Sequence, residues 1–542
     1  MGVRSDFFEE IFFSSFEKLT VVSEEAKDVL GGSSIELLKE EGINHQVIKQ
    51  CYGLLPEESE PKNRRWLIDG VSGLSIALLQ ALKPLHQNLG VLSASHRSNT
   101  FMGTPVVREI GDGDILVNDV FSGERLGRQY VSLLVQHRRT LQSALEQATG
   151  HDGSVIVFAA KKVYFNQLRL SKVLRDCGYK TVALVFDQNM VKHQAGFFDD
   201  IIYTDFISFL MLLNSVDRKL LLHTQGWLFR YHIPVLIDTY KPKHCRQIIE
   251  IMDSQSFYLP EATVSKIPDT MKMAWGENVI ENHQLQLACE HYIVHHADGV
   301  IFNGDDEYRR PLVKRDSPHL RNKHLAFPAL PVKDFFHASN IVNQEKRLVF
   351  VGGVPPFSAN RPHELFGDSQ LLGLVMKLIA RGCYLDIYNN PLIAAEEEYA
   401  KLYPDFIELA KRHRNFNFFI GDMPQHINQK IAHYDFGLMV YDFGGIYTGD
   451  LHFKHLIPTK LFNYLEAGLP VLVSDRFSAV CSIVKEYRIG VIINQREIEF
   501  LPEIIEMLDV AELKRNVVAA REELQMHNNI HRLTGFYEQV MA

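Results

Sequence analysis

The sequence predicts an α/β fold in which two parallel sheets follow one another along the chain. From residue 154 onward, short apolar segments alternate with amphipathic helical segments. This alternation is typical of parallel strands joined by right-handed crossover helices. It is interrupted at residues 326–336, where Pro328 and Pro331 remove the periodicity. We therefore expect an accessory domain at 1–150 and two sheet-containing domains at 151–335 and 336–525.

Length and composition exclude several classes of protein. A chain of 542 residues is too long for one core and is expected to form two to four domains. A hydrophobic content of 46% with 23% charged residues is ordinary for a soluble globular protein. The net charge of −9 argues against a nucleic-acid partner, which would need a basic surface. No stretch approaches the roughly 18 apolar residues of a membrane span.

The cysteines indicate a reducing compartment. Six of them lie far apart, without a C-x-x-C pair. This spacing predicts reduced thiols in a cytoplasmic protein and argues against a zinc site.

The first 150 residues predict an α/β extension with no recognisable chemistry. Strands are expected within residues 66–82, 88–95 and 114–120, and a long amphipathic helix at 125–148. We interpret this part as a domain for homo-oligomerisation, membrane approach or acceptor binding. An aromatic stripe near the N-terminus has the spacing of one helix face: Phe7, Phe8, Ile11, Phe12, Phe13 and Phe16. The stripe indicates docking on the core or on a second subunit; the alternative is peripheral association with the inner face of a membrane.

The middle region predicts five apolar strands, a less regular stretch at 243–275, and a final helix and strand. The strands are expected at 154–160, 181–187, 199–205, 219–227 and 234–242. The first is followed by an amphipathic helix in which Arg169 belongs to the polar face. His223, Gln225 and Asp238 are expected to end their strands and to face a cleft. A helix at 281–296 then leads into the strand of ADGVIFNG, at 297–304.

The last third repeats the alternation more clearly. Strands are expected at 346–354, 383–390, 416–423 and 436–443, with helices near 370–381, 408–412 and 428–432. Ligands of parallel sheets bind where the strands' carboxyl ends meet helix N-termini. Five residues fall at such ends and together predict a cleft: Gly352, Gly353, Gly421, Tyr441 and Lys460.

The most informative segment is IPTKLFNYLEAGLPVLVSD, at 457–475. Pro458 is suited to a helix start and Gly468 to the left-handed residue that ends the helix. A buried strand follows. A helix N-terminus that faces a cleft favours an anion, and Lys460 in its first turn adds a positive charge.

This segment resembles the donor-site signature of GT-B glycosyltransferases, in particular the retaining, family 4 type group related to glycogen and sucrose-phosphate synthases. The resemblance implies two facing Rossmann-like domains and a C-terminal helix, 526–542, that crosses back to the middle domain. It also implies a metal-independent transfer of sugar from a nucleotide-sugar donor, with no cofactor. The residues that it implies for the donor site are Gly352, Gly353, Arg361, Gly421, Asp422, Met423, Tyr441, Pro458, Thr459, Lys460 and Asn463.

Four positions depart from the family pattern. Asn463 stands where the family has the Glu that holds the donor ribose, and His455 stands where the E-x7-E spacing places the partner Glu. The family's Arg and Lys after the first glycines are also replaced, with Arg361 as a displaced candidate. Asn463 can still hydrogen-bond a ribose hydroxyl, without the strengthening effect of charge.

The expected chemistry is stabilisation of a leaving nucleotide diphosphate by fixed cations and dipoles. Residues 151–542 contain no Asp-x-Asp, the spacing of a metal-dependent transferase. In the family, positions like those of His223 and Asp238 contact acceptor or donor sugar, so both are catalytic candidates with Lys460. The acceptor is expected to be a glycan, a lipid-linked sugar or a protein, as in polysaccharide biosynthesis. The alternatives are a nucleotide-sugar-binding protein without turnover and a GT-B-like sugar epimerase.

Overall fold

The computed structural model describes most of the chain from residue 155 onward and short stretches before it. The described stretches of the N-terminal region are 65–69, 89–93, 100–101, 104–111, 115–116 and 142–150. From 155 onward the gaps are 161–162, 187–195, 205–208, 210–212, 214–215, 217, 268–272, 275–276, 279–280, 314–322, 340, 342, 355–370, 392–395 and 445. The expected N-terminal aromatic stripe, most of the helix at 125–148, and Arg361 lie outside the described residues.

The middle domain contains a seven-stranded sheet in the order β14-β13-β10-β9-β6-β7-β8. All of its strand pairs are parallel. The chain enters at β6, runs to one edge, and returns to build the other half from β9, as in doubly wound Rossmann sheets. The strands are β6 (Val155–Ala160), β7 (Lys180–Val185), β8 (Asp200–Tyr203), β9 (Leu221–Gly226), β10 (Arg246–Ile251), β13 (Gly299–Phe302) and β14 (His324–Ala326). The helices and the small hairpin are α8 (Phe165–Asp176), α10 (His232–Tyr240), α11 (Gln255–Tyr258), α12 (Glu261–Val264), β11 (Met273–Ala274), β12 (Glu277–Asn278), α13 (Glu281–His296) and α14 (Arg309–Leu312).

The C-terminal domain contains a six-stranded parallel sheet in the equivalent order, β17-β16-β15-β18-β19-β20. Its central strands β18 and β19 are wholly buried, which explains their uninterrupted apolar sequences. The strands are β15 (Arg347–Gly352), β16 (Tyr384–Asn389), β17 (Phe416–Ile420), β18 (Phe436–Met439), β19 (Val471–Ser474) and β20 (Gly490–Ile493). The helices are η6 (Lys333–Phe335), which precedes the sheet, and α15 (Leu372–Ala380), α16 (Glu396–Leu402), α17 (Pro404–Arg412), α18 (Pro424–Ile431), α19 (Asp450–His455), α20 (Thr459–Glu466), α21 (Ser478–Tyr487), η8 (Ile498–Phe500), α22 (Leu501–Glu506), α23 (Val510–Leu524) and α24 (Met526–Met541).

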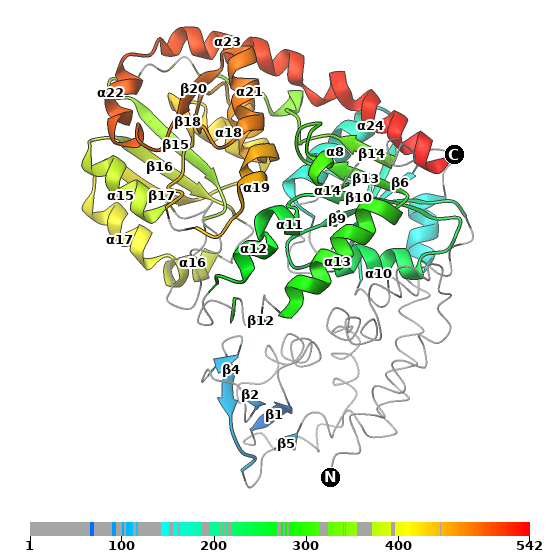
Figure 1. The fold of residues 1–542 in the computed structure, drawn as a ribbon. Coiled ribbons are helices and arrows are strands. Elements are labelled where there is room, and N and C mark those ends of the chain that lie inside the picture. Colours follow the sequence, from blue (N-terminus) through cyan, green and yellow to red (C-terminus); the bar gives the residue numbers. More distant parts are fainter. Residues whose placement is uncertain are drawn as a thin grey trace.

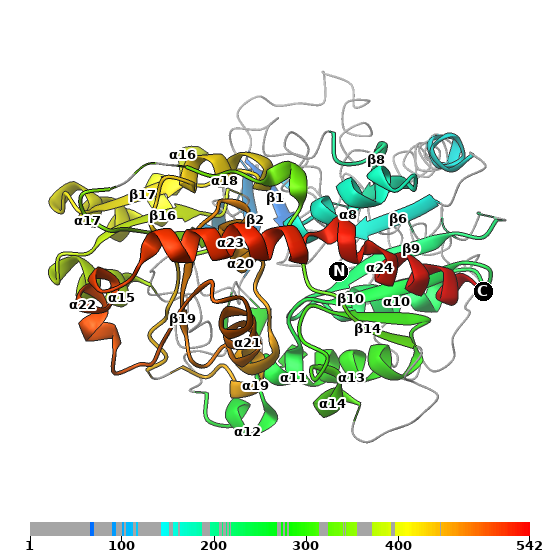
Figure 2. The same ribbon diagram turned by 90° about the horizontal axis from the view of Figure 1, so that it is seen from above.

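Two Rossmann-like sheets of this order, facing each other across a cleft, constitute the GT-B fold, so the predicted fold class is confirmed. Figure 1 shows the two domains side by side. Seen from above in Figure 2, α23 lies over the C-terminal domain and α24 continues over the middle domain. There α24 packs on β13. Val540 and Phe536 of α24 lie so close to Gly299 of β13 that an added Cβ would contact both. The C-terminal helix therefore joins the two domains.

The N-terminal extension contributes a five-stranded sheet, β3-β4-β2-β1-β5, in which only β3 and β4 pair antiparallel. Its strands are β1 (Trp66–Asp69), β2 (Leu89–Leu92), β3 (Thr100–Phe101), β4 (Thr104–Val107) and β5 (Ile115–Leu116). Among the described residues, no helix is both long and apolar enough to cross a bilayer.

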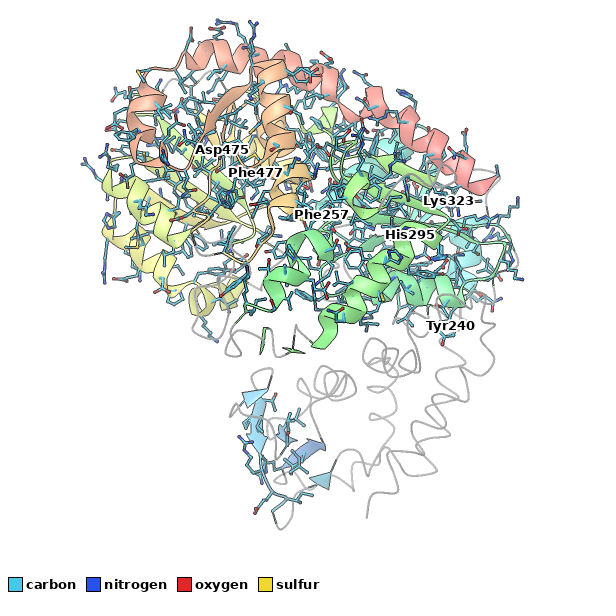
Figure 3. All side chains as sticks on the ribbon, viewed as in Figure 1. Tyr240, Phe257, His295, Lys323, Asp475 and Phe477 are labelled. Carbon is cyan, nitrogen blue, oxygen red and sulfur yellow. The ribbon has the colours of Figure 1, made fainter. Side chains whose placement is uncertain are left out.

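The two Rossmann-like domains touch beside the cleft. The Gly449 N–H donates to the Tyr258 carbonyl over 3.0 Å, and Gly304 forms a β-bridge with Leu456. Phe257, labelled in Figure 3, lies on α11 where this helix meets α19. The segment that precedes α20 is therefore held by the middle domain.

Two expectations for the middle domain are wrong. Of residues 234–242, expected to be a strand, 234–240 belong to helix α10. Pro234 lies in its first turn, where proline is tolerated. The stretch 243–275, expected to be less regular, contains the buried strand β10. An apolar run of this length does not distinguish a buried strand from a buried helix.

The end of α20 confirms the role predicted for Gly468. Its φ is +74°, and its N–H donates to the Leu465 carbonyl over 3.0 Å. The next N–H, that of Leu469, donates to the Tyr464 carbonyl over 2.8 Å. These two bonds form a Schellman motif, which turns the chain directly into β19.

Candidate donor-binding site

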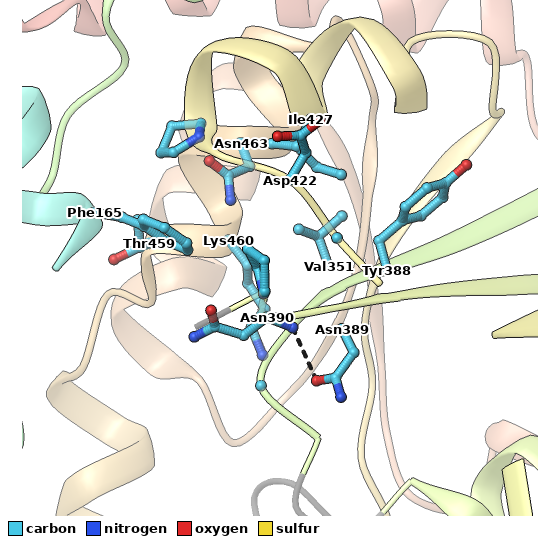
Figure 4. Close-up of a pocket in the computed structure, with 15 residues that line it drawn as sticks. Phe165, Val351, Tyr388, Asn389, Asn390, Asp422, Ile427, Thr459, Lys460 and Asn463 are labelled. Atoms are coloured by element: carbon cyan, nitrogen blue, oxygen red, sulfur yellow. Dashed lines mark hydrogen bonds between the residues drawn. The ribbon is translucent and has the colours of Figure 1, made fainter. Parts of the chain in front are cut away.

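A pocket of about 170 Å³ lies at the carboxyl ends of β15, β16 and β17, beside the N-termini of α18 and α20. It is open to the interdomain cleft, since Phe165 of α8 in the middle domain also lines it (Figure 4). The lining residues are Phe165, Val351, Gly352, Gly353, Tyr388, Asn389, Asn390, Pro391, Gly421, Asp422, Pro424, Ile427, Thr459, Lys460 and Asn463. Seven of the predicted donor-site residues are thus brought together.

Two glycines of the pocket are required by backbone geometry. Gly352 has φ +142°, a conformation that side chains disfavour, and a Cβ there would lie 3.4 Å from Lys460 Cε. A Cβ at Gly421 would collide with the Asn389 carbonyl, to which the Gly421 N–H donates over 2.6 Å. The absence of both side chains leaves the backbone open to a ligand.

Lys460 occupies the first turn of α20 and is half-buried. Its ammonium lies over the ring of Phe350, 4.4 Å from the centroid, and over the ring of Tyr441 at 5.0 Å. It also donates a hydrogen bond to the Tyr441 hydroxyl. These aromatic contacts fix the position of the charge at the edge of the pocket.

Asn389 organises the loop at the end of β16. Its Oδ1 accepts hydrogen bonds from the N–H groups of Val354 (2.8 Å) and Asn390 (2.9 Å). Its Nδ2 is buried and has no hydrogen-bond partner among the described residues.

Asn463 lies one turn along α20 from Lys460 and is joined to a buried ion pair. Arg169, from α8 of the middle domain, donates to Asn463 Oδ1 and to both carboxylate oxygens of Glu466. The side chains of Arg169 and Glu466 are completely buried. Glu466 also accepts from the Val332 N–H (2.7 Å) and from Asn428 Nδ2 (2.6 Å). This cluster therefore connects the pocket to the domain interface.

Asp422 is a pocket carboxylate that already has a cation. Burial alone would raise its pKa, but Lys430 at 2.8 Å and the Met423 N–H outweigh burial and lower the pKa. Asp422 therefore stays ionised at neutral pH and is paired with Lys430.

The remaining donor-site predictions lie beside the pocket. Pro458 immediately precedes α20, Met423 is buried just before α18, and Tyr441 is buried against Lys460. Arg361 lies outside the described residues.

His223 and Asp238, predicted to be catalytic, do not line the pocket. His223 lies inside β9 rather than at its end; it is stacked on Phe158 and shares a 2.8 Å hydrogen bond with Tyr537 of α24. Asp238 is on α10, where it pairs with Lys241 at 3.0 Å and accepts from the Tyr292 hydroxyl at 2.5 Å. The placement at strand ends was wrong for both, and both have structural partners here.

His455 is also turned away from the pocket. Its Nδ1 lies 3.0 Å from Asp305 Oδ1 of the middle domain, and its carbonyl accepts from the Asp305 N–H over 3.2 Å. His455, at the position where the resemblance implies a Glu, thus makes a contact between the two domains.

Sequence reasoning missed Phe165, Arg169, Asn389 and Asn390. Asn389 and Asn390 directly follow an apolar strand, so the rule used for Gly352 could have found them. Phe165 and Arg169 gave no local signal, because they reach the site from the other domain. No group of His, Cys, Asp and Glu among the described residues is arranged to bind a metal ion.

Comparison with known proteins supports no closer assignment. No family model matches the chain, and no curated protein matches it in sequence. Among solved structures, AviGT4, a glycosyltransferase involved in avilamycin A biosynthesis, is 14% identical with a TM-score of 0.42, covering 72% of this chain and 98% of that chain. The N-terminal domain of Candida albicans trehalose-6-phosphate phosphatase is 10% identical with a TM-score of 0.42, covering 72% of this chain and 98% of that chain. The wall teichoic acid polymerase TagF is 10% identical with a TM-score of 0.34, covering 76% of this chain and 96% of that chain. These TM-scores and identities are too low to assign the fold or a family, so the fold assignment depends on the sheet order. The resemblance to glycogen synthases stays a prediction.

Proposed function

We propose that this protein is a glycosyltransferase that moves a sugar from a nucleotide-sugar donor to a glycan, lipid-linked or protein acceptor, with retention of configuration, in cytoplasmic polysaccharide biosynthesis. The observation that carries the proposal is Lys460, held by aromatic rings at the start of α20 in a pocket of the interdomain cleft. Glycosyl transfer needs stabilisation of the negative charge that develops on the leaving diphosphate.

The proposed roles follow from this position. Lys460 binds the diphosphate, and the positive end of the α20 dipole adds to this attraction. Gly352 and Gly353 allow the phosphates to approach the backbone. Middle-domain residues such as Phe165 exclude water from the other side of the pocket. Retention of configuration and the acceptor classes are taken from the family resemblance.

A panel of donors tests the proposal. Release of nucleotide diphosphate from UDP- and GDP-sugars, and of CMP from CMP-sugars, is measured with and without cell-envelope acceptors. We expect one donor to be turned over faster when an acceptor is present. Absence of turnover with every donor would contradict the proposal.

We expect turnover to be independent of metal ions, because Lys460 and the helix dipole supply the positive charge that a metal would otherwise supply. The chain has one Asp-x-Asp, Asp112 and Asp114, which lies in the N-terminal extension outside the described residues. Rates are measured in EDTA and after adding Mg²⁺ or Mn²⁺. A rate that EDTA abolishes and metal restores would refute this expectation.

A second candidate function is binding of nucleotide sugar without turnover. It is favoured by the two non-acidic positions, since Asn463 is engaged by Arg169 and His455 by Asp305. Calorimetry distinguishes the two functions: a protein that binds a nucleotide sugar tightly but releases no product with any acceptor has this second function.

A further inference from the structure

The hydrogen bond between Arg169 and Asn463 determines which end of the Asn463 amide faces the pocket. A guanidinium can only donate, so the amide atom beside Arg169 Nη2 must be the oxygen. The amide nitrogen is then left without a hydrogen bond to any described residue. In Figure 4 this nitrogen lies on the side of the amide that is closer to Lys460.

Asn389 has the same arrangement. Two backbone N–H groups occupy its Oδ1, which again leaves an Nδ2 without a partner among the described residues. Asn389 is completely buried, so its unmet donor is costly, whereas Asn463 is 5% exposed. The pocket thus combines the Lys460 ammonium with the amide donor of Asn463, while its carboxylate, Asp422, is paired with Lys430.

We propose that the Asn463 amide donates a hydrogen bond to a ligand in the pocket, and that Arg169 is the positioning residue that holds the amide in this orientation. The ligand is a phosphate or diphosphate whose oxygens reach Lys460 and Asn463 together. Lys460 and Asn463 are three residues apart on one helix, so they share a face. The inference rests on the proposed donor site but not on turnover.

The isosteric change Asn463→Asp tests the donor role. It keeps the oxygen that Arg169 binds and replaces the pocket-facing N–H groups with an acceptor oxygen. We expect the Kd of the full chain for inorganic pyrophosphate, measured by calorimetry, to rise about 10-fold or more, with an unchanged or higher Tm. Asn516→Asp, on the exposed side of α23, makes the same charge change and should alter the Kd by about 2-fold or less. Equal or tighter binding by Asn463→Asp would overturn the proposal.

The positioning role of Arg169 needs a variant that folds. Replacing the whole pair, Arg169→Met with Glu466→Met, leaves no buried charge behind and keeps similar volume. The change still removes the acceptor of the Val332 N–H and of Asn428 Nδ2, so we expect the double variant to fold with a lower Tm than the wild type. We expect it to bind pyrophosphate about 5-fold more weakly, because the amide is free to turn. A folded double variant with the wild-type Kd would overturn the role of Arg169.

Failure of this inference is distinguishable from failure of the proposed function. A wild-type protein that turns over a nucleotide sugar but tolerates Asn463→Asp refutes the inference alone. A wild-type protein that binds pyrophosphate in an Asn463-dependent way but transfers no sugar refutes the function alone. If the wild-type protein does not bind pyrophosphate, the inference is overturned.

Discussion

Replacement of Lys460 by alanine is expected to lower kcat/KM by about 100-fold or more. The change removes a charge-assisted contact to the donor diphosphate, and such contacts contribute roughly 1.5–3 kcal/mol. The loss is greater where charge develops in the transition state. Steady-state kinetics with the donor identified by the panel measures the effect.

Folding should be much less affected by this substitution. Lys460 is half-buried against Phe350 and Tyr441, and each such cation–π contact contributes about 0.5–1 kcal/mol. Lys411→Ala, at a side chain that is 71% exposed on α17, is the matched control and should leave kcat/KM and Tm unchanged. Near-normal turnover in Lys460→Ala would mean that the diphosphate binds elsewhere.

The position of Lys460 was predictable because its neighbours carry local signals. Apolar strands buried on both faces, with glycine or proline at their ends, locate the strand ends of the C-terminal sheet without knowledge of tertiary structure. Gly352, Gly421 and Lys460 were placed at one sheet edge by this rule, and the structure brings them into one pocket. The edge strand β20 was not predicted, although its sequence, GVII, is also a short apolar run.

The contribution of the other domain was not predictable from local pattern. Arg169 belongs to the polar face of α8, which the sequence pattern assigns to solvent, yet its side chain is completely buried. Its partner Glu466 is 297 residues away in sequence. Polar residues that meet across a domain interface have the same periodicity as exposed ones. The opposite error was made for His223, which was expected to face the cleft but lies inside the sheet. Its hydrogen-bond partner there, Tyr537, comes from the C-terminal helix, so the sequence near His223 gives no sign of it.

Removal of the Glu466 side chain is expected to have the largest effect on stability. Glu466→Ala leaves the Arg169 guanidinium buried without its counterion, and the Val332 N–H and Asn428 Nδ2 without their acceptor. Breaking a buried ion pair by deleting one partner costs about 3–5 kcal/mol. Urea unfolding should show this loss as a lower midpoint. Glu503→Ala, in an exposed pair with Arg381, is the control and should cost about 1 kcal/mol or less.

The origin of the expected loss is the uncompensated charge rather than the missing attraction. Taking Arg169 and Glu466 out of water is itself costly, so the intact pair contributes little net stability compared with apolar side chains of similar volume. The double replacement with methionine removes the uncompensated charge but not the two unmet donors, so it should recover part of the stability that Glu466→Ala loses. If the double variant is as unstable as the single one, the ion pair itself stabilises the domain interface, and Arg169 is retained for stability rather than to orient Asn463.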